Sequence, residues 1–276
     1  MNKELFNVDA GRCLKCGACI RDCFFGALGS GADGLPVMVN PDRCMHCQHC
    51  FAICPTGAVC FAGKRPEDSV SVAGLDLPTP EQAENYLRSR RSVRRYADCD
   101  VDRALLERIL KTLGNTPTGC NARALKFTCI SSRSAMEAFR RDFISAIENH
   151  RDGAKLLPRW LAVPAIQMRQ GKKDVFFRGA SGMLIVSSDE KAPGVTTPQE
   201  DVVIACSHFE FLAKANGLAT CWCGFLRLVQ REVPELLEKS LSLRPTTPFY
   251  AMLFGYPAVN YVRGVQRDDE ALIDIR

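Results

Sequence analysis

Two runs of four cysteines, identical in spacing, limit what this chain can fold into more than any other feature. Each run reads C-x2-C-x2-C-x3-C; the first begins at Cys13 and the second at Cys44, 31 residues later. Eight of the 15 cysteines lie in these runs. Thiolates packed this densely on a turning loop can surround a cubane iron–sulfur cluster. The spacing therefore predicts two clusters and a protein that transfers electrons.

The residues around the two runs repeat as well. Arg12 precedes the first run and Arg43 precedes the second. Over about residues 8–62 the sequence resembles the bacterial two-cluster ferredoxins. The two runs differ in the residue that follows them: Phe24 follows the first run, whereas Pro55 follows the second.

This resemblance implies a crossed set of cluster ligands, because in two-cluster ferredoxins the fourth cysteine of each run binds the cluster of the other run. One [4Fe–4S] cluster is then bound by Cys13, Cys16, Cys19 and Cys54. The second is bound by Cys44, Cys47, Cys50 and Cys23. A pair of zinc sites is the alternative, since CxxC is also a zinc spacing. Zinc does not require a third cysteine in step and a fourth after it in both runs, so we favour iron–sulfur clusters.

Length and composition indicate a two-domain protein of the cytoplasm. The 276 residues suffice for two domains, and 46% of them are hydrophobic. No apolar run approaches the roughly 20 residues of a membrane span. The first residues lack the apolar core of a secretory signal. Because most thiols are assigned to metal, a reducing compartment is expected, and we predict no membrane partner.

The formal net charge of +5 is unevenly spread along the chain. Five arginines lie within eight residues: Arg88, Arg90, Arg91, Arg94 and Arg95. No nucleic-acid-binding fold accompanies them, so we predict no nucleic-acid partner. Guanidinium groups beside a serine hydroxyl suit a discrete phosphate through charge-assisted hydrogen bonds. The alternative is an ordinary solvated surface.

The chain divides into a cluster domain, a linker and a larger domain. Residues 1–62 hold the cysteine motifs, and residues 63–80 are rich in proline, glycine and charge, as a linker is. Residues 81–276 alternate helical and strand patterns, which predicts an α+β fold. Strands are expected at 125–131, 182–188, 219–223 and 248–254.

Four helices are predicted from their capping residues. They begin at Thr79, Asp100, Ser134 and Thr197. The second buries Val101, Leu105, Ile109 and Leu113; the third buries Met136, Phe139, Phe143 and Ile147. The fourth extends to Asn216 and is expected to bury Ile204, Phe211, Leu212 and Ala215.

Four segments of the larger domain carry its resemblance to a known family. They read R-S-R-R-S-V-R-R-Y at 88–96, P-T-G-C-N-A-R at 117–123, G-L-A-T-C-W-C-G-F at 217–225 and Y-V-R-G-V-Q-R at 261–267. In this order and spacing they resemble the FMN-dependent nitroreductase superfamily across about residues 81–276. The resemblance implies an α+β fold that forms an intertwined homodimer with two FMN sites at the subunit interface.

The resemblance also implies which residues bind FMN. Arg90, Ser92 and Arg94 hold its phosphate and ribityl chain, with Arg91 in the same loop. Arg263 completes the phosphate site, and Asn121 bonds the flavin ring. The amides of Cys223 and Gly224 face the reactive edge of the flavin, where donors stabilise its reduced form. Relatives often have glutamine at the position of Arg123 and lysine at that of Asn260, so contacts from these two positions are not carried over.

Several further features are assigned to structure rather than chemistry. Residues 29–34 match G-x-G-x-x-G but lie between the cysteine runs, not between a strand and a helix, so no nicotinamide site is predicted. His208 is expected to be a satisfied core residue. The remaining thiols are read as small buried hydrophobes: Cys60, Cys99, Cys120, Cys129 and Cys206. Cys221 and Cys223 are read as small strand residues.

Together these features predict an iron–sulfur flavoprotein oxidoreductase. Electrons from an external low-potential donor, a ferredoxin or reductase, pass through the clusters to FMN and on to a small organic acceptor. Nitroaromatics and quinones are the expected acceptors by family analogy. The alternatives are a redox relay for a protein partner and another flavin reduction, such as dehalogenation or ene reduction. Neither the substrate, the donor nor the role of residues 156–173 follows from the sequence.

Overall fold

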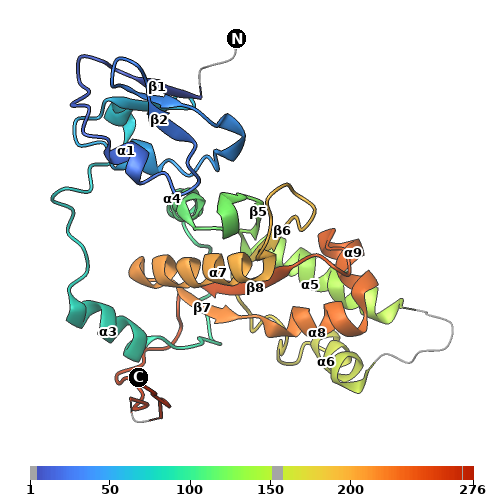
Figure 1. The fold of residues 1–276 in the computed structure, drawn as a ribbon. Coiled ribbons are helices and arrows are strands. Elements are labelled where there is room, and N and C mark those ends of the chain that lie inside the picture. Colours follow the sequence, from blue (N-terminus) through green and yellow to red (C-terminus); the bar gives the residue numbers. More distant parts are fainter. Residues whose placement is uncertain (1–4, 151–157, 269) are drawn as a thin grey trace. The chain divides into compact units, whose positions relative to one another are not determined.

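The computed structural model describes residues 5–150, 158–268 and 270–276. The chain divides into two compact units, Met1–Pro78 and Thr79–Arg276 (Figure 1). Within the described ranges, no helix is long and apolar enough to cross a membrane.

The first unit is built from two similar halves. Each half holds one cysteine run, and a one-turn helix within the run carries its third cysteine: α1 (Ala18–Arg21) or α2 (His49–Ala52). Two antiparallel pairs complete it: β1 (Phe6–Val8) with β4 (Val59–Phe61), and β2 (Leu28–Ser30) with β3 (Pro36–Met38). The repeat in the sequence is therefore a repeat in the structure.

Left-handed backbone recurs at equivalent positions between the cysteines. Lys15 and His46 have φ of 53° and 52°, and Gly17 and Gln48 have φ of 71° and 63°. Side chains other than glycine rarely adopt this conformation, and it turns the chain sharply. The same strained turn built twice explains how each run can wrap around one centre.

The first part of the predicted linker contacts the first unit. Arg12 donates to the Gly57 carbonyl at 3.3 Å and forms an ion pair with Glu67. Residues Pro66–Asp68 form a 3₁₀ turn in the expected linker. These contacts attach the segment to the first unit, because Arg12 reaches it across 55 residues of chain.

The second unit contains one antiparallel sheet of four strands in the order β5-β6-β8-β7. The strands are β5 (Leu125–Ile130), β6 (Gly182–Ser188), β8 (Phe249–Gly255) and β7 (Ala219–Trp222). The register pairs Ile185 with Ala251, and Leu253 with Cys221. All four predicted strands are confirmed to within one residue at each end.

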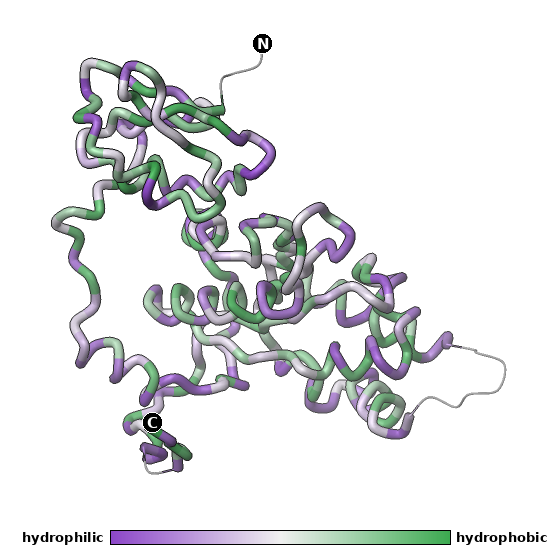
Figure 2. Tube along the Cα trace, in the orientation of Figure 1, coloured by the Kyte–Doolittle hydropathy of each residue, from purple (hydrophilic) through white to green (hydrophobic). Residues whose placement is uncertain are grey.

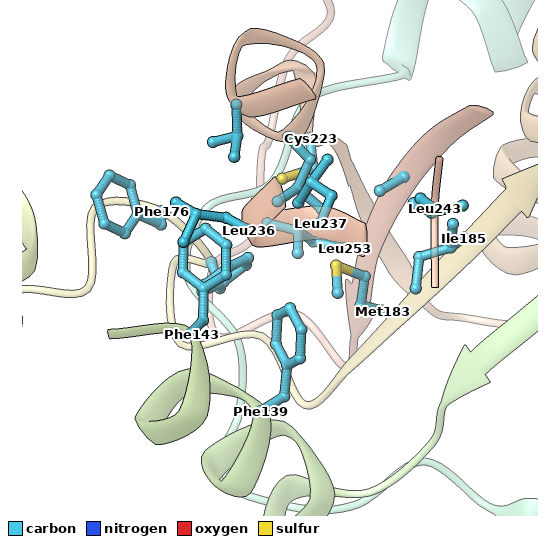
Figure 3. Close-up of a cluster of buried hydrophobic side chains, with 14 of the residues drawn as sticks. Phe139, Phe143, Phe176, Met183, Ile185, Cys223, Leu236, Leu237, Leu243 and Leu253 are labelled. Atoms are coloured by element: carbon cyan, nitrogen blue, oxygen red, sulfur yellow. The ribbon is translucent and has the colours of Figure 1, made fainter. Parts of the chain in front are cut away.

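Alternate strand residues face two separate hydrophobic cores, as the period of a strand requires. Met183, Ile185 and Leu253 belong to the core that α5, α8 and α9 cover, part of which Figure 3 shows. Leu184 and Met252 belong to the core under α4 and α7. The sheet thus has helices on both faces, which confirms the predicted α+β fold.

Seven α-helices accompany the sheet in the described part of this unit. Their bounds are α3 Pro80–Ser89, α4 Arg103–Thr112, α5 Arg133–Glu148, α6 Arg159–Arg169, α7 Pro198–Ala215, α8 Gly224–Glu232 and α9 Pro234–Leu241. Hydrophilic and hydrophobic residues alternate along these helices (Figure 2), as expected for helices with one buried face. Residues 156 and 157 of the segment without an assigned role lie outside the described residues; α6 occupies most of the rest.

Two helix starts differ from prediction, each by two residues. Asp102, not Asp100, caps α4, where its carboxylate accepts the Leu105 amide at 2.7 Å. Ser132, not Ser134, caps α5. Asp100 instead accepts the Arg133 amide at 2.7 Å, so a neighbouring helix start takes this carboxylate. The predicted capping box of Thr79 and Gln82 in α3 is confirmed.

The buried face of α7 is not the predicted one. Ile204 and Phe211 are 38% and 39% exposed, whereas Ala205, Phe209 and Ala213 are fully buried. Apolar residues lie all around this helix, so their spacing alone does not select a face. His208 is exposed and contacts the Thr116 hydroxyl rather than lying in the core.

The prediction of buried thiols outside the motifs is correct only in part. Cys206 is buried, and Cys60 and Cys129 are half-buried. Cys99 and Cys120 are exposed: Cys99 lies in a loop before α4, and Cys120 lies in the 3₁₀ turn Gly119–Asn121 before β5.

Candidate functional site

Four cysteines line one cavity of the first unit, and they come from both runs. Its wall includes Cys13, Cys16 and Cys19 of the first run together with Cys54, the last cysteine of the second. Apolar residues such as Ile20 and Val59 complete the wall. Among the described residues no three potential ligands converge on a single ion. The thiols are instead spread around a cavity, an arrangement that suits a group larger than one ion.

Backbone amides donate to the fourth cysteine of each run. The Ala58 amide lies 3.2 Å from Cys54 Sγ, and the Ala27 amide lies 3.3 Å from Cys23 Sγ. Burial acts to raise the pKa of Cys54, but the hydrogen bonds from Ala58 and Thr56 hold it below its ordinary value. Donors of this kind favour the thiolate, which is the form that binds metal.

The cysteines of the second run also lie near one another. Burial, together with the neighbouring Cys47 and Cys44 thiolates, raises the pKa of Cys50 to about 11. Such mutual repulsion is relieved when a cation neutralises the thiolates. Beside this run, His49 Nδ1 lies 3.3 Å from a carboxylate oxygen of Asp22 in the first half.

The arginine-rich loop of the second unit lies along the free edge of β7. The Val93 amide donates to the Thr220 carbonyl at 2.9 Å, which fixes the loop to the sheet. Arg94 is exposed, and Arg91 and Ser92 are partly exposed. Arg91, Ser92 and Arg94 thus lie on either side of Val93, the residue that anchors the loop to the sheet.

The C-terminal segment approaches the same loop. The Ala258 amide donates to the Arg95 carbonyl at 3.0 Å, and Arg91 lies 6.0 Å from the centre of the Tyr261 ring. Next to Arg263, a side chain on Gly264 would lie 3.0 Å from the Arg88 carbonyl. The structure thus brings the segment of Arg263 to the arginine loop, although some 170 residues separate them in the sequence.

Sequence reasoning missed an acidic partner of this loop. Glu210 of α7 is buried, and its carboxylate lies 3.3 Å from Nη1 of Arg90. The Thr220 hydroxyl donates to the same oxygen at 3.2 Å. The sequence offered one sign of it, a glutamate placed among the apolar residues of this helix.

Roles for Tyr96 and Arg178 were not predicted, although Tyr96 is the last residue of the arginine-rich motif at 88–96. The Tyr96 hydroxyl donates to the Val93 carbonyl at 2.9 Å. Burial raises the pKa of Tyr96, while the nearby Arg94 and Arg178 act to lower it. Arg178 has a left-handed φ of 58°, so it occupies an unusual turn before β6. Arg178 lies outside the motifs that the sequence displays.

Asn121 lies in a strained turn at the opposite edge of the sheet from the arginine loop. Cys120, Asn121 and Arg123 all have positive φ, of 50°, 53° and 55°. This turn precedes β5, whereas the arginine loop borders β7, and β6 and β8 separate these two edges. Neighbouring strands lie about 4.8 Å apart, so the edges are roughly 14 Å apart. Within one chain, Asn121 does not join the arginines.

Arg123 has a structural role in this turn. Its guanidinium donates to the Gly114 carbonyl at 2.6 Å, and its amide donates to the Thr118 hydroxyl at 3.0 Å. Asp201 of α7 accepts the Gly119 amide at 2.9 Å and the Thr197 hydroxyl at 3.1 Å. The turn is therefore held from both ends.

Gly119 permits this close approach, and its replacement tests the packing. A Cβ at this position would lie 2.2 Å from Thr197 Oγ1, whose hydroxyl is already fixed by Asp201. We expect Gly119→Ala to lower the free energy of unfolding by about 1–3 kcal/mol, the usual range for overpacking. Gly114→Ala is the matched control, because its Cβ would meet nothing within 4 Å. Equal denaturation curves for the two variants would contradict this packing.

Strand β7 leads directly into α8, and the backbone amides of Cys223 and Gly224 at this junction have different surroundings. The Cys223 amide donates to the Ala251 carbonyl at 2.8 Å. It is used within the sheet and does not face a ligand, so this part of the prediction is wrong. Gly224 is the first residue of α8, where amides have no partner inside the helix. Burial raises the pKa of the Cys223 thiol to about 12, so it is an inert core thiol.

Comparisons with known proteins agree with both halves of this description. Residues 87–256 match the model of the nitroreductase family. The chain belongs to the nitroreductase family. Residues 12–59 match the model of the 4Fe-4S dicluster domain. The two resemblances inferred from the motifs are thus confirmed.

Individual relatives of this nitroreductase-family protein are distant in sequence. A protein of Methanothermobacter thermautotrophicus named "Putative NADH dehydrogenase/NAD(P)H nitroreductase" is 26% identical over 178 residues, 63% of this chain and 76% of the relative. A crystallised nitroreductase with bound FMN from Bacteroides fragilis has a TM-score of 0.52 at 19% identity, over 70% of this chain and 99% of its own. A nitroreductase with bound FMN from Desulfitobacterium hafniense has a TM-score of 0.50 at 19% identity, over 70% of this chain and 97% of its own. At this identity the structures show a common fold.

Proposed function

We propose that this protein is an iron–sulfur flavoprotein that passes electrons from two [4Fe–4S] clusters to FMN and on to a small organic acceptor. The observation that carries the proposal is the fusion itself: a unit with cysteines around a cavity is joined to a nitroreductase-family unit with an anchored arginine loop. Fusion replaces a diffusional encounter between donor and acceptor by a high effective concentration.

The residues present fit both cofactors. The cavity wall supplies four thiols for one cluster, with Cys54 as the crossed ligand. Arg91, Arg94 and Arg263 supply exposed or partly exposed cations for a phosphate, and the first amides of α8 supply donors for a ring edge. When bound, FMN exchanges electrons singly with a cluster and in pairs with an organic acceptor. The chain's own residues bind and orient it.

Binding of the FMN phosphate can be tested directly. We expect Arg94→Ala and Arg263→Ala each to weaken FMN binding about tenfold, because charge-assisted bonds to phosphate are lost. Riboflavin lacks the phosphate, so its affinity should be low in the parent protein and almost unchanged in the variants. Fluorescence titration of flavin-free protein measures both. Arg103→Ala is the control, since Arg103 is an exposed arginine on α4 that pairs with Glu107. Equal affinities for FMN and riboflavin would contradict the assignment.

We also propose that the protein is a homodimer with two composite flavin sites. Asn121 lies at the opposite sheet edge from the arginine loop, so a second copy is the source from which it can reach the same ligand. Helix α7 presents Val203, Ile204 and Phe211, each 38% or 39% exposed, as apolar interface surface.

Light scattering of the flavin-loaded protein should give twice the chain mass of 30.5 kDa. Ile204→Lys should shift the mass towards one chain and weaken FMN binding together, because a charge is placed in the interface and the site loses its second copy. Lys111→Glu on α4 is a control for the change of charge. A monomer that retains FMN with full affinity would contradict the composite site.

We propose the acceptor and the donor from the chemistry of the two cofactors. Nitroaromatics and quinones fit a flavin that delivers electron pairs, and a ferredoxin or reductase fits clusters whose potentials can lie several hundred millivolts below zero. Thiolate ligands require a reducing compartment such as the cytoplasm. Anaerobic reduction of the holoprotein, followed by a screen of acceptors for flavin reoxidation, tests this function. Reoxidation only by a protein would favour the redox relay; reoxidation by haloaromatics or activated alkenes would favour dehalogenation or ene reduction.

A further inference from the structure

Glu210 is a buried carboxylate on a mostly apolar face of α7. Its side chain is 7% exposed, and α7 buries Cys206, Phe209 and Ala213 around it. An ionised carboxylate removed from water is unfavourable unless charged and hydrogen-bonded partners replace the solvent. Its presence at this position therefore calls for partners, and the structure supplies two.

Both partners of Glu210 help to anchor the arginine loop. Arg90 Nη1 lies 3.3 Å and Thr220 Oγ1 lies 3.2 Å from the same oxygen, Oε1. The Thr220 carbonyl in turn accepts the Val93 amide at 2.9 Å. Arg90, Glu210, Thr220 and Val93 thus close a ring of contacts around the start of the loop.

Arg90 keeps donors for a second anion. A guanidinium has five N–H donors, and the bond to Glu210 uses one of them. The side chain of Arg90 remains 38% exposed, in contrast to the buried carboxylate. Glu210 therefore fixes the arginine from the protein side while part of the guanidinium stays accessible.

A further nearby cation, on α7, has its hydrogen bond to α3. Lys214 Nζ bonds the Ser89 hydroxyl at 2.7 Å and lies 5.5 Å from the centre of the Tyr86 ring. Tyr86 also packs edge-on against Phe211, with ring centres 4.9 Å apart. These contacts fasten α3 to α7, so Arg90, the residue that ends α3, starts from a fixed backbone position.

We infer that Glu210 is a positioning residue that holds Arg90 in the orientation in which it binds the phosphate of FMN. The inference rests on the proposed function, since it presupposes a phosphate at the arginine loop. A free arginine loses side-chain entropy when it binds an anion, whereas one already held by a buried acid has lost it on folding. Glu210 thus raises phosphate affinity without touching the phosphate.

The test compares FMN with riboflavin, because a positioning role through Arg90 concerns only the phosphate. Glu210→Leu should lower the ratio of FMN affinity to riboflavin affinity by about fivefold, as expected for one unfixed side chain. Arg90→Leu should lower it further. The double variant Glu210→Leu/Arg90→Leu should match Arg90→Leu alone, because Glu210 has no effect once Arg90 is absent. Removing both charges also avoids leaving one buried without its partner.

Two further variants separate positioning from general structure. Thr220→Val keeps the shape but removes one bond to Glu210, and should lower the ratio by a smaller factor. Glu200→Leu, at an exposed acid of the first turn of α7, should leave the ratio unchanged. Circular dichroism of each flavin-free variant checks that it is folded.

Distinct results would overturn the inference. A ratio that rises in Glu210→Leu would show that Glu210 only neutralises Arg90. Equal losses of FMN and riboflavin affinity, or additive effects in the double variant, would show a general structural role. A parent protein with no preference for FMN would overturn the phosphate site and the role of Glu210 together. A parent preference that Glu210→Leu leaves intact would overturn the role of Glu210 alone.

Discussion

Cys54→Ala should lose about half of the iron, and the cluster lost should be the one bound by the first cysteine run. Anaerobically purified parent protein is expected to contain about eight irons per chain, in two cubane clusters. The variant should contain about four, because Cys54 lies with Cys13, Cys16 and Cys19 around one cavity. Iron and acid-labile sulfide analysis measures the loss.

Double variants identify which cluster is lost. Cys54→Ala/Cys13→Ala should contain as much iron as Cys54→Ala, because both cysteines bind the same cluster. Cys54→Ala/Cys44→Ala should contain almost none. Cys60→Ala is the control, since Cys60 lies on β4 outside both runs and should keep all eight irons. The reverse pattern in the two double variants would refute crossed ligation, and zinc without sulfide would refute the clusters.

Removing residues 1–78 should abolish reduction of the flavin by reduced ferredoxin while leaving FMN bound. The cut falls at the boundary between the two compact units, just before the Thr79 cap of α3. All predicted flavin-binding residues lie beyond it, and the second unit has its own hydrophobic cores. Stopped-flow absorbance of the flavin should show a rate reduced by a factor of 100 or more, on the order of the effective concentration that fusion supplies.

A full-length control removes the clusters without removing the unit. Cys13→Ala/Cys44→Ala should show the same loss of ferredoxin-driven reduction. NAD(P)H should reduce the parent slowly, because the chain carries no nicotinamide motif in the required context. If the truncated protein is reduced by NADPH as fast as the parent is by ferredoxin, the clusters are not the entry route for electrons.

Much of the cluster unit follows from sequence because its information is local. Three of the four thiols that line the cavity lie within seven residues, so their covalent spacing nearly fixes their separation. The strands of the second unit can also be predicted from the sequence. They are short β-branched and apolar runs, whose alternate residues face two cores. The arginine loop and the C-terminal segment were recognisable as motifs.

Other features depend on packing that no local pattern encodes. Ile204 and Phe211 were predicted to be buried but are partly exposed. Apolar residues lie on all sides of α7, so only its packing against the sheet selects the buried face. The Cys223 amide was expected at a ligand, but the ladder to β8 extends one residue past the strand and takes it. In α7, more than one apolar face could have packed against the sheet. At Cys223, the sheet and the ligand compete for the same amide.

The sequence by itself determined the cofactor type, the order of the two units and the positions of the four strands. These depend on ligand spacing, motif order and hydrophobic period, which are properties of short stretches of chain. Only the tertiary structure decided that Asn121 lies across the sheet from the arginines and that Glu210 holds Arg90, 120 residues away. Such pairings depend on which strands are neighbours and which helix face meets the sheet, and the whole packed chain sets these together.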